Sequence, residues 1–231
     1  MEEKSLALSF GNSLTEEVSS IAQEYAEIGL DALVEDGLFK DIPIVSTAVS
    51  VYRIGKSIRE RHHIAKLISF LNEINKGITD EKKRQDYRAK FESNEKFRNQ
   101  ELEYILILID RYISFDKPQM LAKLYLAYLD GEITWEEFTM YAEVIDRFLW
   151  PDYRMLVSDS STFHTRNNVG AESILRLVAL GLMAEDNSIS ITEARKTLKG
   201  KNRSASRISS DSKRKTYKRT EFGRKLANLL R

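Results

Sequence analysis

A cluster of basic side chains near the C-terminus is the feature of this sequence that most clearly indicates chemistry. Between Lys196 and Lys215 the chain carries eight Lys or Arg residues and five Ser residues, with little that is apolar. Cationic groups at this density can contact several phosphates and displace condensed counterions from a nucleic acid. We therefore predict a nucleic-acid-binding surface that comprises Lys199, Lys201, Arg203, Arg207, Lys213, Arg214, Lys215, Lys218 and Arg219.

The charge is distributed unevenly along the chain, although its formal net value is only +1. The range 193–231 holds 14 Lys or Arg and three acidic residues, a local net charge of +11, so the remainder carries −10. An acidic body joined to a basic end also fits a protein-interaction scaffold, in which the basic end pairs with an acidic partner or with the body of a second copy. Nucleic acid and an acidic protein surface are both open as partners.

The residues Asp130–Ile133 followed by Glu137 look like the second half of a calcium-binding EF-hand loop, in which glycine makes the turn and the last glutamate is bidentate. If Glu137 takes the twelfth position, however, Leu126 and Tyr128 take the first and third positions, where oxygen ligands are required. Thr134 is instead placed to cap a helix while Glu137 reaches back to it, which is a capping box. We expect a helical corner here and no calcium site.

No other residue pattern nominates a catalytic or metal-binding site. The chain has no cysteine, which excludes disulfides, thiolate nucleophiles and thiolate-ligated metals. His62 and His63 are adjacent and would point about 100° apart on a helix, while His164 lies in a distant polar segment. Neither a glycine-rich phosphate loop nor a serine nucleophile elbow is present. We therefore predict a non-enzymatic binding protein without a cofactor.

The range 42–58 is apolar and is flanked or interrupted by basic residues, so it has two interpretations. One is an amphipathic helix on an anionic membrane, which would make the protein a membrane-surface effector. The other is a buried bundle helix, which we favour because Arg53 and a long polar run interrupt the apolar surface. No stretch has the roughly 18 uncharged apolar residues of a membrane span, and Met1–Lys4 do not begin a secretory signal. We expect a cytoplasmic protein.

The body that precedes the basic end is expected to be a helical bundle with its core between Leu102 and Phe148. A helix at 102–113 is apolar on every face, which is typical of a central helix. A second helix begins near Pro118, and a third follows Thr134. Further helices are predicted at 13–35, at 43–75 with a bend at 55–57, and at 79–91.

The pattern changes after residue 168. A helix at 171–183 is followed by Ser188–Thr192, whose alternation of polar and apolar residues predicts a strand. After the basic tract come a return strand at Thr216–Arg219 and a last helix that Thr220 caps. This order resembles the second half of a winged-helix domain, in which a helix is followed by a two-stranded wing and a closing helix.

A helical body with this ending also resembles the Abi-alpha group of bacterial proteins, which are associated with abortive infection by phage. The resemblance implies a role in phage defence and supplies no catalytic residues. We therefore predict a mainly α fold, in which a helical bundle at 1–157 is joined by a linker at 158–168 to a small winged-helix-like α+β region at 169–231. Its predicted function is to contact nucleic acid through the basic C-terminal region.

Overall fold

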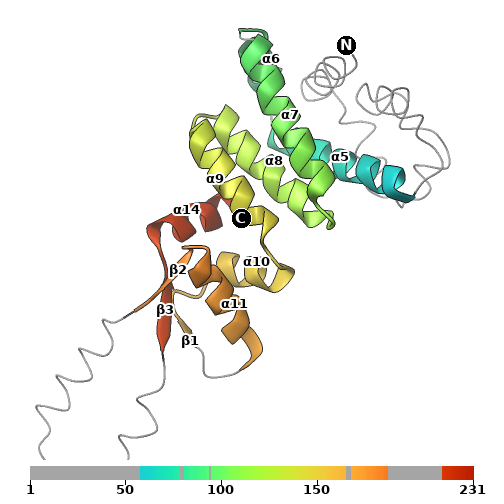
Figure 1. Cartoon of the computed structure of the whole chain (residues 1–231). Coiled ribbons are helices and arrows are strands. Elements are labelled where there is room, and N and C mark those ends of the chain that lie inside the picture. The colour runs from blue at the N-terminus through green and yellow to red at the C-terminus, as the bar shows by residue number, and fades with distance from the viewer. Residues whose placement is uncertain (1–57, 79–80, 94, 165–167, 187–214) are drawn as a thin grey trace, which may run out of the picture. The chain divides into compact units, whose positions relative to one another are not determined.

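The computed structural model describes residues 58–78, 81–93, 95–164, 168–186 and 215–231 of the chain (Figure 1). Within these ranges it contains eight helices and a small three-stranded antiparallel sheet near the C-terminus, which confirms the predicted mainly α fold. The chain divides into two compact units, Met1–Asp146 and Arg147–Arg231, and each is described by itself. The predicted helix at 13–35, the range 42–57 and the predicted strand at 188–192 lie outside the described residues.

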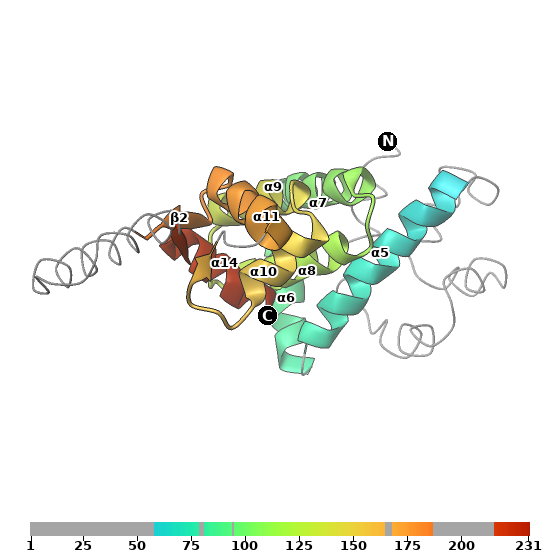
Figure 2. The ribbon, with the colours of Figure 1, turned by 90° about the horizontal axis from the view of Figure 1, so that it is seen from below.

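The first unit contains five described helices, namely α5 (Ile58–Gly77), α6 (Glu81–Ser93), α7 (Glu95–Arg111), α8 (Asp116–Leu129) and α9 (Trp135–Asp146). Helix α8 packs against α5 and α9, and α7 packs against α5 and α6 (Figures 1 and 2). The five helices correspond to those that the sequence predicted in this part of the chain. Gly77 ends α5, as expected from its position after the apolar series.

Among the described helices of this unit α8 is the central one, and the prediction that 102–113 is buried on every face is wrong. In that range the Ile107 side chain is 60% exposed and Ile113, which follows α7, is 85% exposed. Among the described residues, neighbouring helices cover one side of α7, where Leu102, Ile105 and Ile109 are fully buried. An apolar residue on the open side costs little because folded surfaces always retain apolar atoms.

Aromatic side chains fill the space between α5, α8 and α9. The ring of Tyr125 is fully buried, with its centroid 6.4 Å from that of Phe70 and 5.8 Å from that of Phe138. The Tyr128 hydroxyl donates to the buried Glu101 carboxylate, which ties α8 to α7. Burial raises the pKa of Glu101, although the hydrogen bond from Tyr128 opposes this shift.

The corner between α8 and α9 is held by backbone capping at the end of α8 and by side-chain capping at the start of α9. The Glu132 N–H donates to the Ala127 carbonyl, and Gly131, whose φ of 79° favours glycine, makes the turn. At the start of α9, the Glu137 N–H donates to the Thr134 hydroxyl over 3.2 Å and the Thr134 N–H donates to the Glu137 carboxylate over 3.0 Å. The predicted capping box is therefore confirmed.

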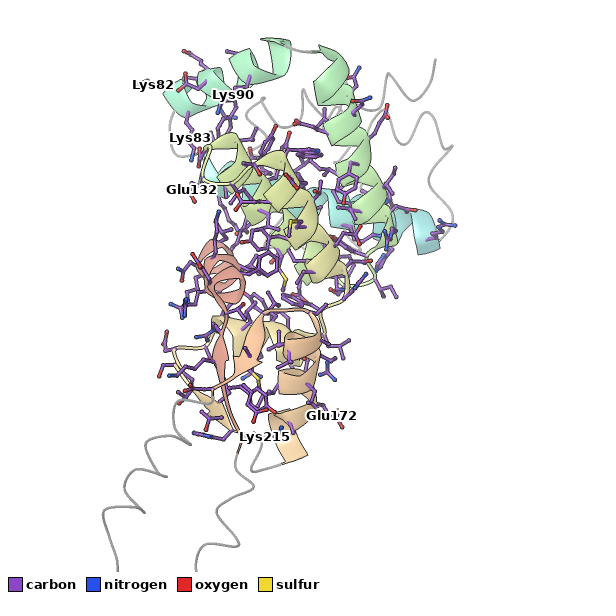
Figure 3. All side chains as sticks on the ribbon, turned by 60° about the vertical axis from the view of Figure 1, so that its left-hand side comes forward. Lys82, Lys83, Lys90, Glu132, Glu172 and Lys215 are labelled. Carbon is purple, nitrogen blue, oxygen red and sulfur yellow. The ribbon has the colours of Figure 1, made fainter. Side chains whose placement is uncertain are left out.

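Two lysines of α6 fasten the ends of neighbouring helices, and Figure 3 labels both. The Lys83 ammonium donates to the Gly77 carbonyl over 3.2 Å and to the Asp130 carboxylate over 2.9 Å. The Lys90 ammonium donates to the Leu129 carbonyl at the end of α8. The charged helix that the sequence predicted at 79–91 is thus attached to the unit by its cations as well as by the buried Tyr87.

The second unit is built from α10 (Trp150–Val157), β1 (Phe163–His164), α11 (Asn168–Ala179), β2 (Met183–Glu185), β3 (Thr216–Arg219) and α14 (Glu221–Leu230). The strands form a sheet in the order β1-β3-β2, with both pairs antiparallel. Helix α10 packs against α11 and α14. The return strand has its predicted bounds, and the Thr220 hydroxyl accepts from the Gly223 N–H, which confirms the predicted cap.

Helix α11 ends before the residue that the sequence suggested. Gly181 has a φ of 73°, its N–H donates to the Val178 carbonyl, and the Leu182 N–H donates to the Leu177 carbonyl. This left-handed turn is a Schellman motif, which closes a helix and redirects the chain. Met183 is consequently the first residue of β2, and the prediction of helix through residue 183 is wrong at its end.

The second unit also begins earlier in the chain than the predicted boundary at 158–168. Helix α10, which falls within the predicted bundle at 1–157, packs on α11 and buries Asp152 and Leu156 completely. Strand β1 lies inside the range predicted as a linker and pairs with β3, Phe163 opposite Tyr217. The polar composition of 158–168 therefore concealed a short edge strand.

No helix among the described residues is long and apolar enough to cross a membrane.

Gly223 lies where α14 approaches the backbone of the α11–β2 turn, and this contact gives a first prediction. A Cβ at this position would lie 2.0 Å from the Leu182 carbonyl oxygen. We expect Gly223→Ala to destabilise the protein by about 1–3 kcal/mol through overpacking, measured by chemical denaturation of the full chain. Asn228→Ala, at an exposed position of the same helix, should be neutral. A Gly223→Ala variant as stable as the parent protein would contradict this packing.

Candidate nucleic-acid interface

The basic tract leaves and re-enters the fold on two neighbouring strands. Strands β2 and β3 pair with Ala184 opposite Lys218 and Glu185 opposite Tyr217. The Asp186 N–H then extends the pairing by donating to the Thr216 carbonyl over 2.7 Å. Both ends of the range 187–215 are therefore fixed at the same end of the sheet, which is the arrangement that a wing requires.

The charge of this connection comes from residues that the structure does not describe. The range 187–214 contains eight Lys or Arg and two acidic residues, a net charge of +6. Six of the predicted site residues lie in it, namely Lys199, Lys201, Arg203, Arg207, Lys213 and Arg214. Their role in binding stays a prediction.

The two lysines at the base of the connection are paired with acidic side chains. The Lys215 ammonium lies 2.9 Å from the Glu185 carboxylate, and the hydrogen bond from Lys215 to Glu185 raises the lysine pKa. The Lys218 ammonium lies 2.7 Å from the Asp186 carboxylate. Figure 3 labels Lys215 at this end of the sheet. The base of the connection is thus close to neutral, and a phosphate there would have to compete with two carboxylates.

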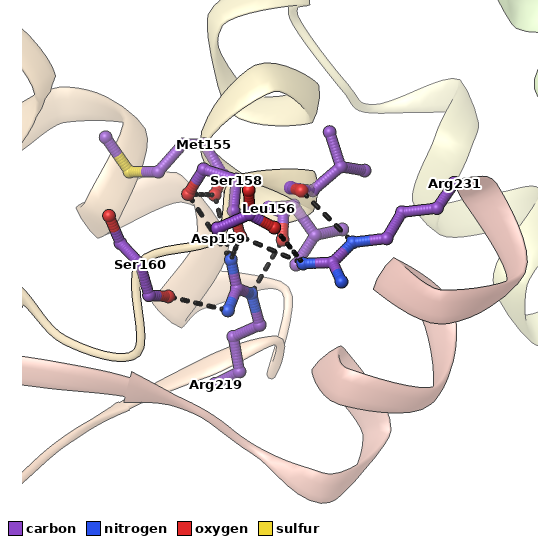
Figure 4. A network of polar contacts seen from close by, with 8 residues as sticks. Met155, Leu156, Ser158, Asp159, Ser160, Arg219 and Arg231 are labelled. Carbon is purple, nitrogen blue, oxygen red and sulfur yellow. Dashed lines mark hydrogen bonds and ion pairs between the residues drawn. The ribbon is translucent and has the colours of Figure 1, made fainter.

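Arg219, the last predicted site residue, is used inside the second unit (Figure 4). Its guanidinium donates to the carbonyls of Leu156 over 2.6 Å, Ser158 over 2.5 Å and Ser160 over 2.8 Å. It also lies over the Phe163 ring, 5.0 Å from the centroid. The Leu156 carbonyl lies in the last turn of α10, where helical partners are missing, and the Ser158 and Ser160 carbonyls follow the helix. Arg219 therefore ties β3 to α10.

Arg231 supports the same helix end. It donates to the Val157 carbonyl over 3.2 Å and to the Ser158 carbonyl over 3.1 Å (Figure 4). It also pairs with the exposed Asp159 carboxylate at 3.4 Å. Two arginines from separate elements thus share the carbonyls that end α10.

Helix α11, which precedes β2, presents little that could read bases on the side chains that the structure describes. Arg176 forms a bidentate contact with the fully buried Asp152, at 2.8 Å between its Nη2 and one carboxylate oxygen, and Ser173 is itself buried. Its exposed positions include Glu172, Leu175 and Ala179, an acid and two apolar residues. Base readout in a groove needs donors and acceptors on such a helix, and the exposed side chains that the structure describes on α11 do not supply them.

Burial by itself would raise the pKa of Asp152. Hydrogen bonds from Arg176, Ser173 and the Leu149 N–H outweigh that effect and lower the Asp152 pKa below its ordinary value. The sequence predicted neither this pair nor the structural role of Arg219. The partners in these contacts lie far apart along the chain and form no local pattern.

The histidines and acidic residues of the described ranges do not assemble a metal site. The ring of His62 lies 4.7 Å from that of Phe115, and the His63 ring nitrogen lies 3.2 Å from the Asp110 carboxylate. His164 lies 3.3 Å from the Thr216 hydroxyl. Within the part of the chain that the structure describes, no three His, Asp or Glu side chains are grouped so that they could hold a metal ion.

Comparison with known proteins found no relative of this chain. No protein-family model, no curated protein and no solved structure matches this chain. The resemblance to the Abi-alpha group therefore stays a prediction.

Asp152 is expected to make stability depend on pH, which is the second prediction. Because its folded pKa is lowered, its stabilising contribution is present above the unfolded pKa of about 3.9 and is lost as the pH falls through the folded value. We expect Asp152→Asn to cost about 1–3 kcal/mol at neutral pH and progressively less below pH 4, measured by denaturant unfolding across pH. Asp159→Asn, an exposed control, should show little effect. A cost for Asp152→Asn that does not change with pH would exclude this role.

The third prediction separates a structural Arg219 from a nucleic-acid-binding one. Arg219→Met should destabilise the protein by about 2–3 kcal/mol, because several carbonyls, most of them part-buried, lose a charged donor. Lys218→Met, on the same strand and exposed, should change stability by much less. Thermal unfolding measures both. If Arg219→Met unfolds like the parent protein while it weakens nucleic-acid binding, Arg219 is a ligand-contact residue instead.

Proposed function

We propose that this chain is a non-enzymatic protein that binds nucleic acid through the basic connection between β2 and β3. The observation that carries the proposal is the antiparallel β2–β3 pair, which fixes both ends of a segment with a net charge of +6 at one end of the sheet. A cationic segment anchored in this way can follow a phosphate backbone. The residues proposed to contact phosphates are Lys199, Lys201, Arg203, Arg207, Lys213, Arg214, Lys215 and Lys218.

The binding is expected to have little dependence on base sequence. Helix α11 offers Glu172 and Leu175 where a reading helix would offer amide or guanidinium groups. Arg219 is left out of the proposed contacts because its guanidinium is occupied by carbonyls of the unit. The proposal also places the protein in the cytoplasm of a bacterium, in phage defence, as the resemblance to the Abi-alpha group implies.

The second candidate function is a protein-interaction scaffold, and one feature of α11 favours it. In this function the basic connection would pair with acidic side chains of a protein partner, and the same partner would cover Leu175, which is 59% exposed on α11. The two functions differ in what the basic connection binds, which is a nucleic acid in the first and an acidic protein surface in the second. Pull-down of the tagged protein with and without nuclease distinguishes a nucleic acid from a directly bound protein.

The fourth prediction tests the main proposal through the salt dependence of binding. Replacing Lys213, Arg214 and Lys215 with Ala should weaken binding to a labelled oligonucleotide and flatten the slope of log affinity against log salt by about 0.9 for each phosphate that the variant no longer neutralises. Fluorescence anisotropy at several salt concentrations measures both quantities. Lys76→Ala with Lys82→Ala, two exposed lysines of the first unit, serves as the charge-removal control. An unchanged slope in the triple variant would refute the wing as the binding element.

A further inference from the structure

The start of α10 presents large apolar side chains that the second unit does not cover. Leu149 is 52% exposed and Trp150 is 50% exposed. The Trp150 indole stacks on the Tyr153 ring, with centroids 5.1 Å apart and planes inclined by 28°. A half-exposed stacked pair with a leucine beside it is a contiguous apolar surface, and such surfaces mark binding sites.

This aromatic surface is held in place by the fold beneath it. The Leu149 N–H donates to the Asp152 carboxylate over 3.0 Å, and the Asp152 N–H donates to the Leu149 carbonyl over 2.9 Å. Asp152 is itself clamped by Arg176. The Tyr153 hydroxyl donates to the Leu230 carbonyl over 3.4 Å. The aromatic pair is thus ordered before any ligand arrives, which lowers the entropy cost of binding.

The surroundings of the pair are cationic. Arg154 follows Trp150 by four residues, so the two side chains lie on the same side of α10, and Arg147 precedes the helix. Both arginines are exposed, and neither forms an ion pair with a residue that the structure describes. The nearest acid in the helix, Asp152, is fully buried and neutralised by Arg176. The ligand that suits this surface is therefore flat, apolar on its faces and anionic along its backbone.

We propose that Trp150 and Tyr153 form a base-stacking platform for single-stranded nucleic acid, with Arg147 and Arg154 contacting its phosphates. Proteins that bind single strands without sequence preference combine cationic residues with aromatic rings on which bases stack. A duplex hides its base faces and gains nothing from such a platform. The inference rests on the proposed nucleic-acid function and specifies its substrate class, because the wing alone would not separate single strands from duplex.

The experiment compares the binding of the full-length protein to a labelled oligothymidine and to a duplex of equal length at low salt. Trp150→Ala should weaken binding to the single strand roughly tenfold, the reduction expected for one stacked base, and leave duplex binding unchanged. Trp150→Phe, which keeps a ring, should retain most of the affinity. Met140→Ala is the control, because Met140 is exposed to nearly the same extent, at 49%, and belongs to neither proposed binding surface.

Tryptophan fluorescence gives a second readout that does not depend on truncation. Stacking of a base on Trp150 should quench the emission of the parent protein, and the quench should vanish in Trp150→Phe, where only Trp135 remains. Arg154→Glu should weaken single-strand binding without loss of buried atoms. If Trp150→Ala fails to fold, these two measurements decide the matter.

The outcomes separate the platform from the wing. Single-strand affinity that is unchanged in Trp150→Ala but reduced in the triple variant of Lys213, Arg214 and Lys215 would overturn the platform and leave the proposed function intact. An equal weakening of single-strand and duplex binding would overturn it as well. Absence of any nucleic-acid binding at low salt would refute both the platform and the proposed function. If the protein then bound anionic vesicles or another protein through Trp150, the surface would be assigned to that partner.

Discussion

The constraint on which this structure depends is the need to satisfy carbonyl groups at the C-terminal ends of its helices. The last turn of a helix leaves up to four carbonyls without helical partners, and the helix dipole favours a cation there. In five described helices a Lys or Arg from another element supplies the missing donor. Lys83 reaches the end of α5, Lys66 that of α7, Lys90 that of α8, Lys117 that of α9 and Arg219 that of α10. Each contact joins two elements, so the cations act as tertiary ties as well as caps.

This use of cations changes how the charge of the sequence should be interpreted. Lys66 is only 3% exposed and donates to two carbonyls at 2.7 Å, and burial lowers its pKa although Asp110 opposes the shift. Such a residue adds to the count of basic side chains but cannot meet an external anion. The same holds for Arg219 and, through ion pairs, in part for Lys215 and Lys218. Only some of the basic side chains are therefore available to a partner, and the sequence alone does not identify them.

The parts of the fold that the sequence predicted are those with local signals. The Thr134–Glu137 capping box and the Thr220 cap involve residues three apart, and β3 was predicted with its observed bounds. Strand β1 was missed because two residues are too few to show alternation. The contacts of Arg219 and of the Asp152–Arg176 pair join positions far apart in the sequence, so no local spacing predicts them. The candidate site was therefore predicted from composition alone. The sequence did not distinguish Arg219, which has a structural role, from the exposed basic residues.

The positions of the charged and aromatic residues in the second unit bear on how it would bind a nucleic acid. The base of the connection between β2 and β3 is nearly neutral because Glu185 and Asp186 pair with its lysines, so attraction would begin farther along the connection, where the net charge is +6. Electrostatic contacts of that kind fade with salt and do not distinguish one polyanion from another. A stacked aromatic surface such as that of Trp150 and Tyr153 depends on base faces and is insensitive to screening. Discrimination between single strand and duplex would therefore come from the aromatic pair of α10, and long-range capture from the basic connection.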